Sequence, residues 1–159
     1  NNQYGETLVV PESSINEQTK YVIGTNGEKM SKSKNNIINI FLEEKLLKKQ
    51  IMSIETDSKP LESPKNPETC NVFKIYSLLA SNEMIEDLRS KYKNGGFGYG
   101  HAKKELLDLI LNKFSKPREK YNYLMSNKNE IDQILSEGSK KASKTANQVM
   151  DRVRKKLGY

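Results

Sequence analysis

The sequence is poor in the residues that build disulfides, zinc sites and histidine-based catalytic groups. Cys70 is the only cysteine and His101 the only histidine among 159 residues. A single cysteine excludes an intrachain disulfide and a cysteine-rich zinc site, so we expect no metal-binding residues. A serine–histidine triad would have to use His101, and nothing near it resembles a nucleophile elbow. These absences exclude most zinc enzymes and serine hydrolases.

Long apolar runs are also missing. No stretch reaches the length of a membrane-spanning helix, and the chain does not open with a signal peptide. We therefore expect a cytoplasmic protein with no membrane partner. The chain begins at Asn1 without an initiator methionine, which we interpret as the sign of a piece cut from a longer chain.

Positive charge, in contrast, is abundant. Lys and Arg number 27 against 20 Asp and Glu, which gives a formal net charge of +7. Such an excess indicates an anionic partner, either a nucleic acid or a phosphate-rich ligand. The alternative is that surface lysine only provides solubility. Hydrophobic residues make up 35% of the chain, and their helical spacing is typical of a globular protein.

The first part of the chain has the pattern of strands. Residues 7–10 are rich in β-branched side chains and precede Pro11, and residues 21–23 precede Gly24, so both segments predict short strands. Residues 25–36 are rich in Gly, Ser, Asn and Lys, which predicts an exposed mobile loop.

The rest of the chain has a helical period. Apolar residues recur every three or four positions over 42–51, 72–79, 85–92, 102–114, 121–125, 131–135 and 142–157. We expect Asn82 to cap a helix, Gly95 and Gly138 to end helices, and Pro117 to break or kink one. The predicted fold is mainly α: a helical bundle preceded by the end of an α/β domain.

Residues 29–33, Lys-Met-Ser-Lys-Ser, carry the strongest chemical signal. Lysine side chains are flexible point charges suited to phosphate oxygens, and serine hydroxyls and main-chain N–H groups add hydrogen bonds. A helix starting at Asn36 or Ile37 would add the partial positive charge of its N-terminus. The pattern favours a mobile polyphosphate clamp, and the alternative is a solvated basic loop without function.

These five residues match letter for letter the KMSKS signature of class I aminoacyl-tRNA synthetases, and they lie between a predicted strand and a predicted helical domain. Other runs resemble bacterial tryptophanyl-tRNA synthetases: residues 4–6, 10–12, 51–54, 56–58, 70–73, 98–104, 118–121, 134–138 and 153–154. The resemblance covers essentially the whole chain, and the later runs favour the tryptophan enzymes over the tyrosine enzymes.

The resemblance implies the C-terminal part of such an enzyme, in two domains. Residues 1–36 would be the end of a Rossmann-like nucleotide-binding catalytic domain with the KMSKS loop, and residues 37–159 a helical domain that binds the tRNA anticodon region. The HIGH-like motif of the family and most of its tryptophan pocket do not occur in this sequence. The resemblance therefore also implies that this chain alone is inactive.

The resemblance further implies an activity and a set of site residues. The family activates L-tryptophan with ATP and Mg²⁺, transfers it to tRNA(Trp), and works as a cytoplasmic homodimer. Lys29 and Lys32 would be catalytic, because they stabilise the charge on departing pyrophosphate. The ATP-binding residues would be Val22, Lys29, Met30, Ser31, Lys32 and Ser33.

Two alternatives remain open. One is a tyrosyl-tRNA synthetase fragment, and the other is a non-enzymatic helical RNA-binding module. The module would account for the basic residues and for the aromatics interleaved with them, on which unpaired bases could stack. For each aromatic, packing inside the fold is the stronger interpretation. We also interpret Cys70 as a small buried residue or helix start, and Glu55 and Asp57 as turn residues.

Overall fold

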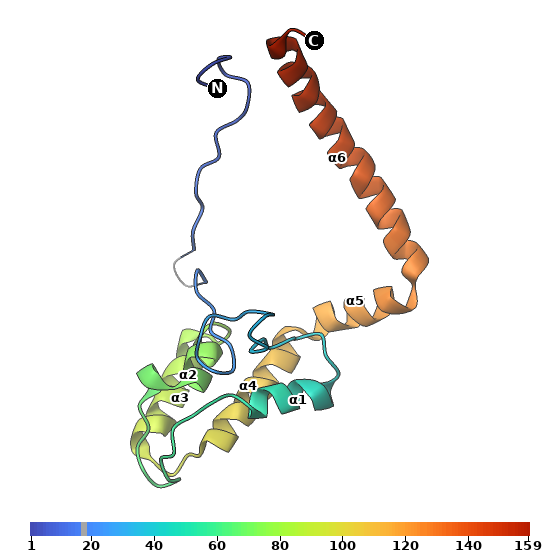
Figure 1. Cartoon of the computed structure of the whole chain (residues 1–159). Helices are drawn as coiled ribbons and strands as arrows, with labels where there is room; N and C mark the ends of the chain where they lie inside the picture. The colour runs from blue at the N-terminus through green and yellow to red at the C-terminus, as the bar shows by residue number, and fades with distance from the viewer. Residues whose placement is uncertain (17–18) are drawn as a thin grey trace. The chain divides into compact units, whose positions relative to one another are not determined.

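The structure is a computed structural model that describes residues 1–16 and 19–159. Its helices are α1 (Glu44–Met52), α2 (Asn71–Ser77), α3 (Asn82–Asn94), α4 (Tyr99–Lys113), α5 (Ser115–Ser126) and α6 (Lys128–Leu157), with a short 3₁₀ turn η1 (Pro67–Thr69) (Figure 1). Within these described ranges, β structure is limited to one isolated bridge between Ile23 and Lys29. None of the described helices combines the length and the apolar character needed to cross a membrane. The chain forms two compact units, residues 16–121 and residues 1–15 with 122–159.

Helix α4 is the centre of the unit formed by residues 16–121. It packs against α1 and α2, and Figure 1 shows it between α1 on one side and α2 with α3 on the other. Its buried face carries Leu106 and Ile110, which follow the predicted spacing. Leu47 of α1 and Val72 of α2 are fully buried in the same core. Each such side chain contributes about 1.5–3 kcal/mol when removed from water.

The predicted helix ends are partly confirmed. Gly95 ends α3 with a positive φ of 73°, as expected of glycine at this position. Pro117 lies in the first turn of α5, where a missing N–H removes no intrahelical bond, so the chain breaks between α4 and α5 as predicted. The N-cap of α3 is Ser81, whose hydroxyl accepts from Met84 N, and our choice of Asn82 was wrong by one residue.

The prediction that Gly138 ends a helix was wrong. Helix α6 runs without interruption from Lys128 to Leu157 through this glycine. A glycine inside a helix costs only about 1 kcal/mol relative to alanine. The strong helix formers on both sides outweigh that cost, and α6 instead ends at Gly158, which has a left-handed conformation.

The predicted strand at residues 7–10 was also wrong. These residues form no bridge with any other described residue, and Val9 and Val10 are 85% and 72% exposed. The segment is tied to α6 instead, through a hydrogen bond of 2.7 Å from Arg152 Nε to the Thr7 carbonyl. β-branched residues prefer a strand, but a strand needs a neighbour to accept its hydrogen bonds.

Candidate functional site

The residues before and within the Lys-Met-Ser-Lys-Ser segment form a tight hairpin. Gly24 N donates to Glu28 O at 2.7 Å, and Met30 N donates to Val22 O at 2.9 Å. Gly27 supplies the positive φ of 78° that the turn between them needs. The strand predicted at residues 21–23 therefore reduces to the single bridge of Ile23, because the chain turns back at once and the described residues provide no further partner strand.

The buried side chain of Asn36 closes the loop that follows the hairpin. Its Oδ1 accepts from Ser31 N at 2.8 Å, and its Nδ2 donates to Asn26 Oδ1 at 2.7 Å and to Lys29 O at 3.2 Å. Asn36 is only 2% exposed. The segment predicted as a mobile loop is thus anchored at both ends. No helix starts at Asn36 or Ile37, because α1 begins at Glu44, so this site has no helix N-terminus directly after the loop.

The three lysines of this segment differ in their electrostatic surroundings. Lys34 Nζ pairs with a carboxylate oxygen of Glu28 at 2.7 Å. This hydrogen bond and its charge lower the pKa of Glu28 and raise the pKa of Lys34. Lys29 and Lys32 are exposed, and neither forms an ion pair with a described residue. The positive charges at Lys29 and Lys32 are therefore open to an anion.

The two serines lie on the same side of the loop. The hydroxyls of Ser31 and Ser33 are 2.9 Å apart and share one hydrogen bond. Each hydroxyl keeps capacity for another partner, because a hydroxyl offers one donor and two acceptor sites. The loop thus brings two free ammonium groups and two hydroxyls into one exposed segment of five residues.

The hairpin is attached to the helical core through main-chain contacts. Glu55 N, which follows α1, donates to Thr25 O at 2.8 Å. Asn71, the first residue of α2, donates through Nδ2 to Glu55 O at 3.0 Å. Gly27 lies against the same amide, since a Cβ at Gly27 would be 2.7 Å from Asn71 Oδ1. Asn36 and Asn71 were not among the predicted site residues, because an asparagine in a polar loop has no distinctive sequence signal.

A hollow of about 620 Å³ lies beside the hairpin, lined in part by Ile23, Gly27 and Phe73. Two cations, Arg89 and Lys74, also line it, and the Arg89 guanidinium stacks over the Phe73 ring at 4.9 Å. Arg89 pairs with Glu68 and with Glu86, and these hydrogen bonds raise its pKa. Two carboxylates therefore offset the charge of Arg89 in this hollow.

The other residues singled out in the sequence have structural roles. Tyr92 is fully buried, and Cys70, the buried N-cap residue of α2, lies with its Sγ 3.4 Å from the Tyr92 hydroxyl. Asp57 accepts from Lys59 N at 3.1 Å and from the Tyr99 hydroxyl at 2.6 Å. The core interpretation of Tyr92, the helix-start interpretation of Cys70 and the turn interpretation of Asp57 are confirmed.

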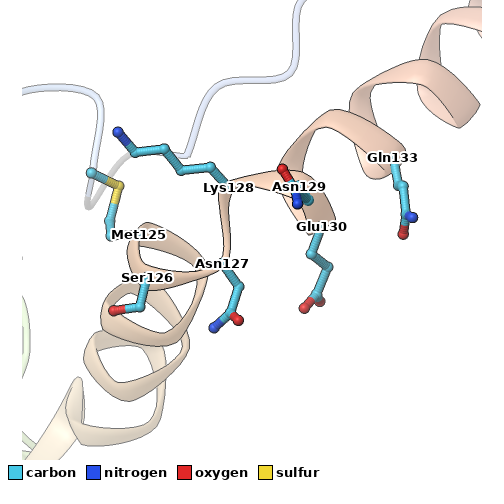
Figure 2. A pocket seen from close by; sticks show the side chains of 7 residues that line it. All are labelled: Met125, Ser126, Asn127, Lys128, Asn129, Glu130 and Gln133. Atoms are coloured by element: carbon cyan, nitrogen blue, oxygen red, sulfur yellow. The ribbon is translucent and has the colours of Figure 1, made fainter.

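The bend between α5 and α6 encloses a second hollow, of about 710 Å³ (Figure 2). Figure 2 shows Asn127, Glu130 and Gln133 directed to one side of the bend and Lys128 to the other. Asn127 Nδ2 donates to Tyr123 O at 2.7 Å and so satisfies a carbonyl at the end of α5. Its lining is mostly polar and includes one cation, Lys128, and one carboxylate, Glu130. In the described part of the chain, no group of three or more His, Cys, Asp or Glu residues could hold a metal ion.

Curated proteins similar to this chain are tryptophan–tRNA ligases. The ligase of Campylobacter jejuni (strain RM1221) is 46% identical over 158 residues, which are 99% of this chain and 50% of that protein. The ligase of Fusobacterium nucleatum is 46% identical over 159 residues, or 99% of this chain and 49% of that protein. The chain thus spans about half the length of the curated relatives that it matches.

Solved structures give the same result. The crystal structure of tryptophanyl-tRNA synthetase from Campylobacter jejuni in complex with ADP and tryptophan matches with a TM-score of 0.85 and 45% identity, over 99% of this chain and 50% of that one. The family described as tRNA synthetases class I (W and Y) matches residues 2–116. Because these residues make up most of the sequence, the chain belongs to the class I tRNA synthetase family of the tryptophan and tyrosine enzymes.

Proposed function

We propose that this chain supplies the half of a tryptophan–tRNA ligase that carries the KMSKS loop and the tRNA-binding helices. One observation carries the site assignment. On a loop anchored by Asn36, Lys29 and Lys32 are free of ion pairs with described residues, whereas Lys34 is neutralised by Glu28. The similarity to tryptophan–tRNA ligases over 99% of the chain supports tryptophan as the amino acid.

The proposed reaction begins with amino acid activation. The carboxylate of tryptophan attacks the α-phosphate of ATP, which enters as its Mg²⁺ complex, and pyrophosphate leaves. Lys29 and Lys32 stabilise the negative charge that develops on the leaving pyrophosphate, and Ser31 and Ser33 donate hydrogen bonds to its oxygens. The chain thereby contributes charge and position and forms no covalent bond with the substrates.

The remaining two ATP-binding residues have supporting roles in this proposal. Val22 would contact adenine through its main chain, and its carbonyl, which accepts from Met30 N, keeps a second lone pair for such a contact. Met30 is partly buried and holds the start of the loop against the hairpin. Both residues position the lysines that follow.

We also propose that residues 1–36 complete a Rossmann-like catalytic domain and that residues 37–159 bind the anticodon region of tRNA(Trp). Lysines and arginines on α3 to α6 support the second role, since they can neutralise phosphates. The hydrogen bond from Glu55 N to Thr25 O crosses the proposed boundary and links the two parts. The complete ligase would act as a homodimer in the cytoplasm.

The test of this proposal compares two lysines of one loop in the complete ligase. Lys32→Ala should lower the rate of tryptophan-dependent pyrophosphate exchange by about 100-fold or more, which is the effect of removing one well-placed charge donor. Lys34→Ala is the matched control, because it removes an equally exposed but paired charge from the same loop, and it should stay within threefold of the parent. A Lys32→Ala rate within twofold of the parent would contradict the assignment.

The same assay separates the alternatives. Exchange driven by tyrosine in place of tryptophan would identify the tyrosine enzyme. The absence of exchange with either amino acid, together with RNA binding that weakens steeply with salt, would identify a non-enzymatic RNA-binding module. The 159-residue chain by itself should show no exchange above the blank, because the family's HIGH-like motif is not in this sequence.

A further inference from the structure

We propose that Asn36 is a positioning residue for the activation reaction, and this inference rests on the proposed function of the KMSKS loop. Its side chain is the only part of the described structure that hydrogen-bonds both to Lys29, at the start of the signature, and to Ser31 inside it. The two contacts use opposite ends of one carboxamide, an acceptor toward Ser31 N and a donor toward Lys29 O. They fix the main chain on both sides of Met30.

The surroundings of Asn36 make this role specific to asparagine. The side chain is 2% exposed, so each of its polar atoms must find a partner inside the protein. Nδ2 faces two acceptor oxygens, Asn26 Oδ1 and Lys29 O, and Oδ1 faces the N–H of Ser31. An aspartate would place a carboxylate oxygen against two other acceptors, and an alanine would remove the partner of Ser31 N and of Lys29 O and leave Asn26 Oδ1 only its bond from Glu28 N.

The main chain of Asn36 is held as tightly as its side chain. Asn36 O accepts from Thr25 N at 2.9 Å, and a Cβ at Gly24 would lie 2.2 Å from that oxygen. Asn35, directly before it, has a positive φ of 50°. The chain therefore bends sharply at Asn35 to return to the hairpin, and residues 31–35 become a short arch between fixed ends.

This arrangement explains how a mobile loop can still place its phosphate-binding side chains accurately. Hydrogen bonds from Asn36 hold the base of the arch, while the side chains of Lys32 and Ser33 remain exposed on it. Catalysis by charge depends on lysine ammonium groups that are already in place when charge develops on the leaving group. Loss of the Asn36 contacts should therefore slow the chemical step more than it weakens the binding of tryptophan.

The experiment combines a kinetic and a structural measurement. In the complete ligase, Asn36→Asp should lower kcat for pyrophosphate exchange at least tenfold and leave KM for tryptophan within twofold. Asn39→Asp is the matched control, because it makes the same chemical change at an exposed asparagine outside the loop, and its kcat should match the parent. In the 159-residue chain, Asn36→Ala should remove the hydrogen-exchange protection of the Ser31 amide but keep that of Met30, which donates to Val22 O.

The outcomes separate this inference from the proposed function. If Lys32→Ala is impaired while kcat of Asn36→Asp stays within threefold of the parent, the inference is wrong and the function stands. Loss of protection at Ser31 and Met30 together would also overturn it, because Asn36 would then only hold the hairpin folded. If the ligase shows no exchange at all, the function fails, and the amide measurement still decides whether Asn36 orders the loop.

Discussion

The two compact units of this chain are stabilised in different ways. All buried hydrophobic side chains of the described residues lie between Ile23 and Ile110, inside the unit formed by residues 16–121. The other unit contains α6, which has no buried residue although Leu135 and Met150 lie along its apolar stripe. The comparison shows that a strong helical pattern predicts a helix but does not predict that the chain itself buries its apolar side.

The difference also bears on the candidate site. The Lys-Met-Ser-Lys-Ser segment lies in the unit with the core, and its hairpin is joined to α2 through Glu55 and Asn71. Its main chain therefore has a fixed support within this chain. Helix α6 keeps its shape through its own hydrogen bonds, and the hydrogen bond from Arg152 to the Thr7 carbonyl joins it to the first residues of the chain.

The largest expected effect is on the free energy of unfolding, and one substitution in each unit tests the contrast between the two units. Leu106→Ala removes a side chain that is 0% exposed in α4, and it should lower the free energy of unfolding by about 2–5 kcal/mol. Leu135→Ala makes the same change at a residue 64% exposed in α6 and should change it by less than about 0.5 kcal/mol. Urea unfolding of the 159-residue chain measures both. Equal losses would show that α6 shares the core.

The second prediction concerns the turn that carries the chain from α3 to α4. Gly95 and Gly96 both have a positive φ, of 73° and 72°. An added Cβ would lie 2.2 Å from Glu62 O at Gly95 and would meet nothing within 4 Å at Gly96. Gly96→Ala should therefore cost about 1–2 kcal/mol from backbone strain alone.

Gly95→Ala carries the same strain and a collision with main chain in addition. Its loss of unfolding free energy should exceed that of Gly96→Ala by at least about 1 kcal/mol. Thermal unfolding followed by circular dichroism compares the two variants directly. A smaller loss at Gly95 than at Gly96 would mean that the loop around Glu62 moves freely away from α3.

Much of this architecture could be predicted from the sequence, because helices with a buried face have a local pattern. The positions of α1 to α4 follow apolar residues at spacings of three and four. The strands could not be predicted correctly, since residues 7–10 have the composition of a strand but no neighbouring strand among the residues that the structure describes. The continuity of α6 through Gly138 is not evident from the sequence, because a glycine between two apolar-periodic segments also fits a helix end.

Some residues of the candidate site could likewise be predicted from the sequence, and others could not. Lys29 and Lys32 could be singled out because a signature of five residues is rare. The roles of Asn36 and Asn71 could not, because they depend on hydrogen bonds between positions far apart in the loop and in α2. The pairing of Lys34 with Glu28 likewise appears only when the hairpin is folded.

The third prediction concerns α6, where we expect a substitution to raise stability instead of lowering it. Gly138 lies inside this helix with open space around its Cα, so an added methyl group meets no obstacle. Gly138→Ala should stabilise α6 by about 0.5–1 kcal/mol, because alanine restricts the unfolded chain more than glycine does. Hydrogen exchange of the amides in α6 measures this locally. Exchange unchanged in the helices of the core unit is the internal control, and faster exchange in α6 would contradict the prediction.

The smallest expected effect concerns a polar link at the start of α4. The hydrogen bond from the Tyr99 hydroxyl is the main cause of the lowered pKa of Asp57. Because the folded pKa of Asp57 is lower than its unfolded value, this link stabilises the fold above the unfolded pKa. Its contribution is lost as pH falls through the folded pKa.

Tyr99→Phe should therefore raise the pKa of Asp57 toward its ordinary value. The pKa of Glu28, which is lowered mainly by its hydrogen bond with Lys34, provides the control and should not change. Carboxyl NMR shifts followed from neutral to acid pH report both groups in one titration. An unchanged Asp57 in Tyr99→Phe would show that the Lys59 amide and the nearby lysines set its pKa, and that the loop before η1 is held by its own turn and not by α4.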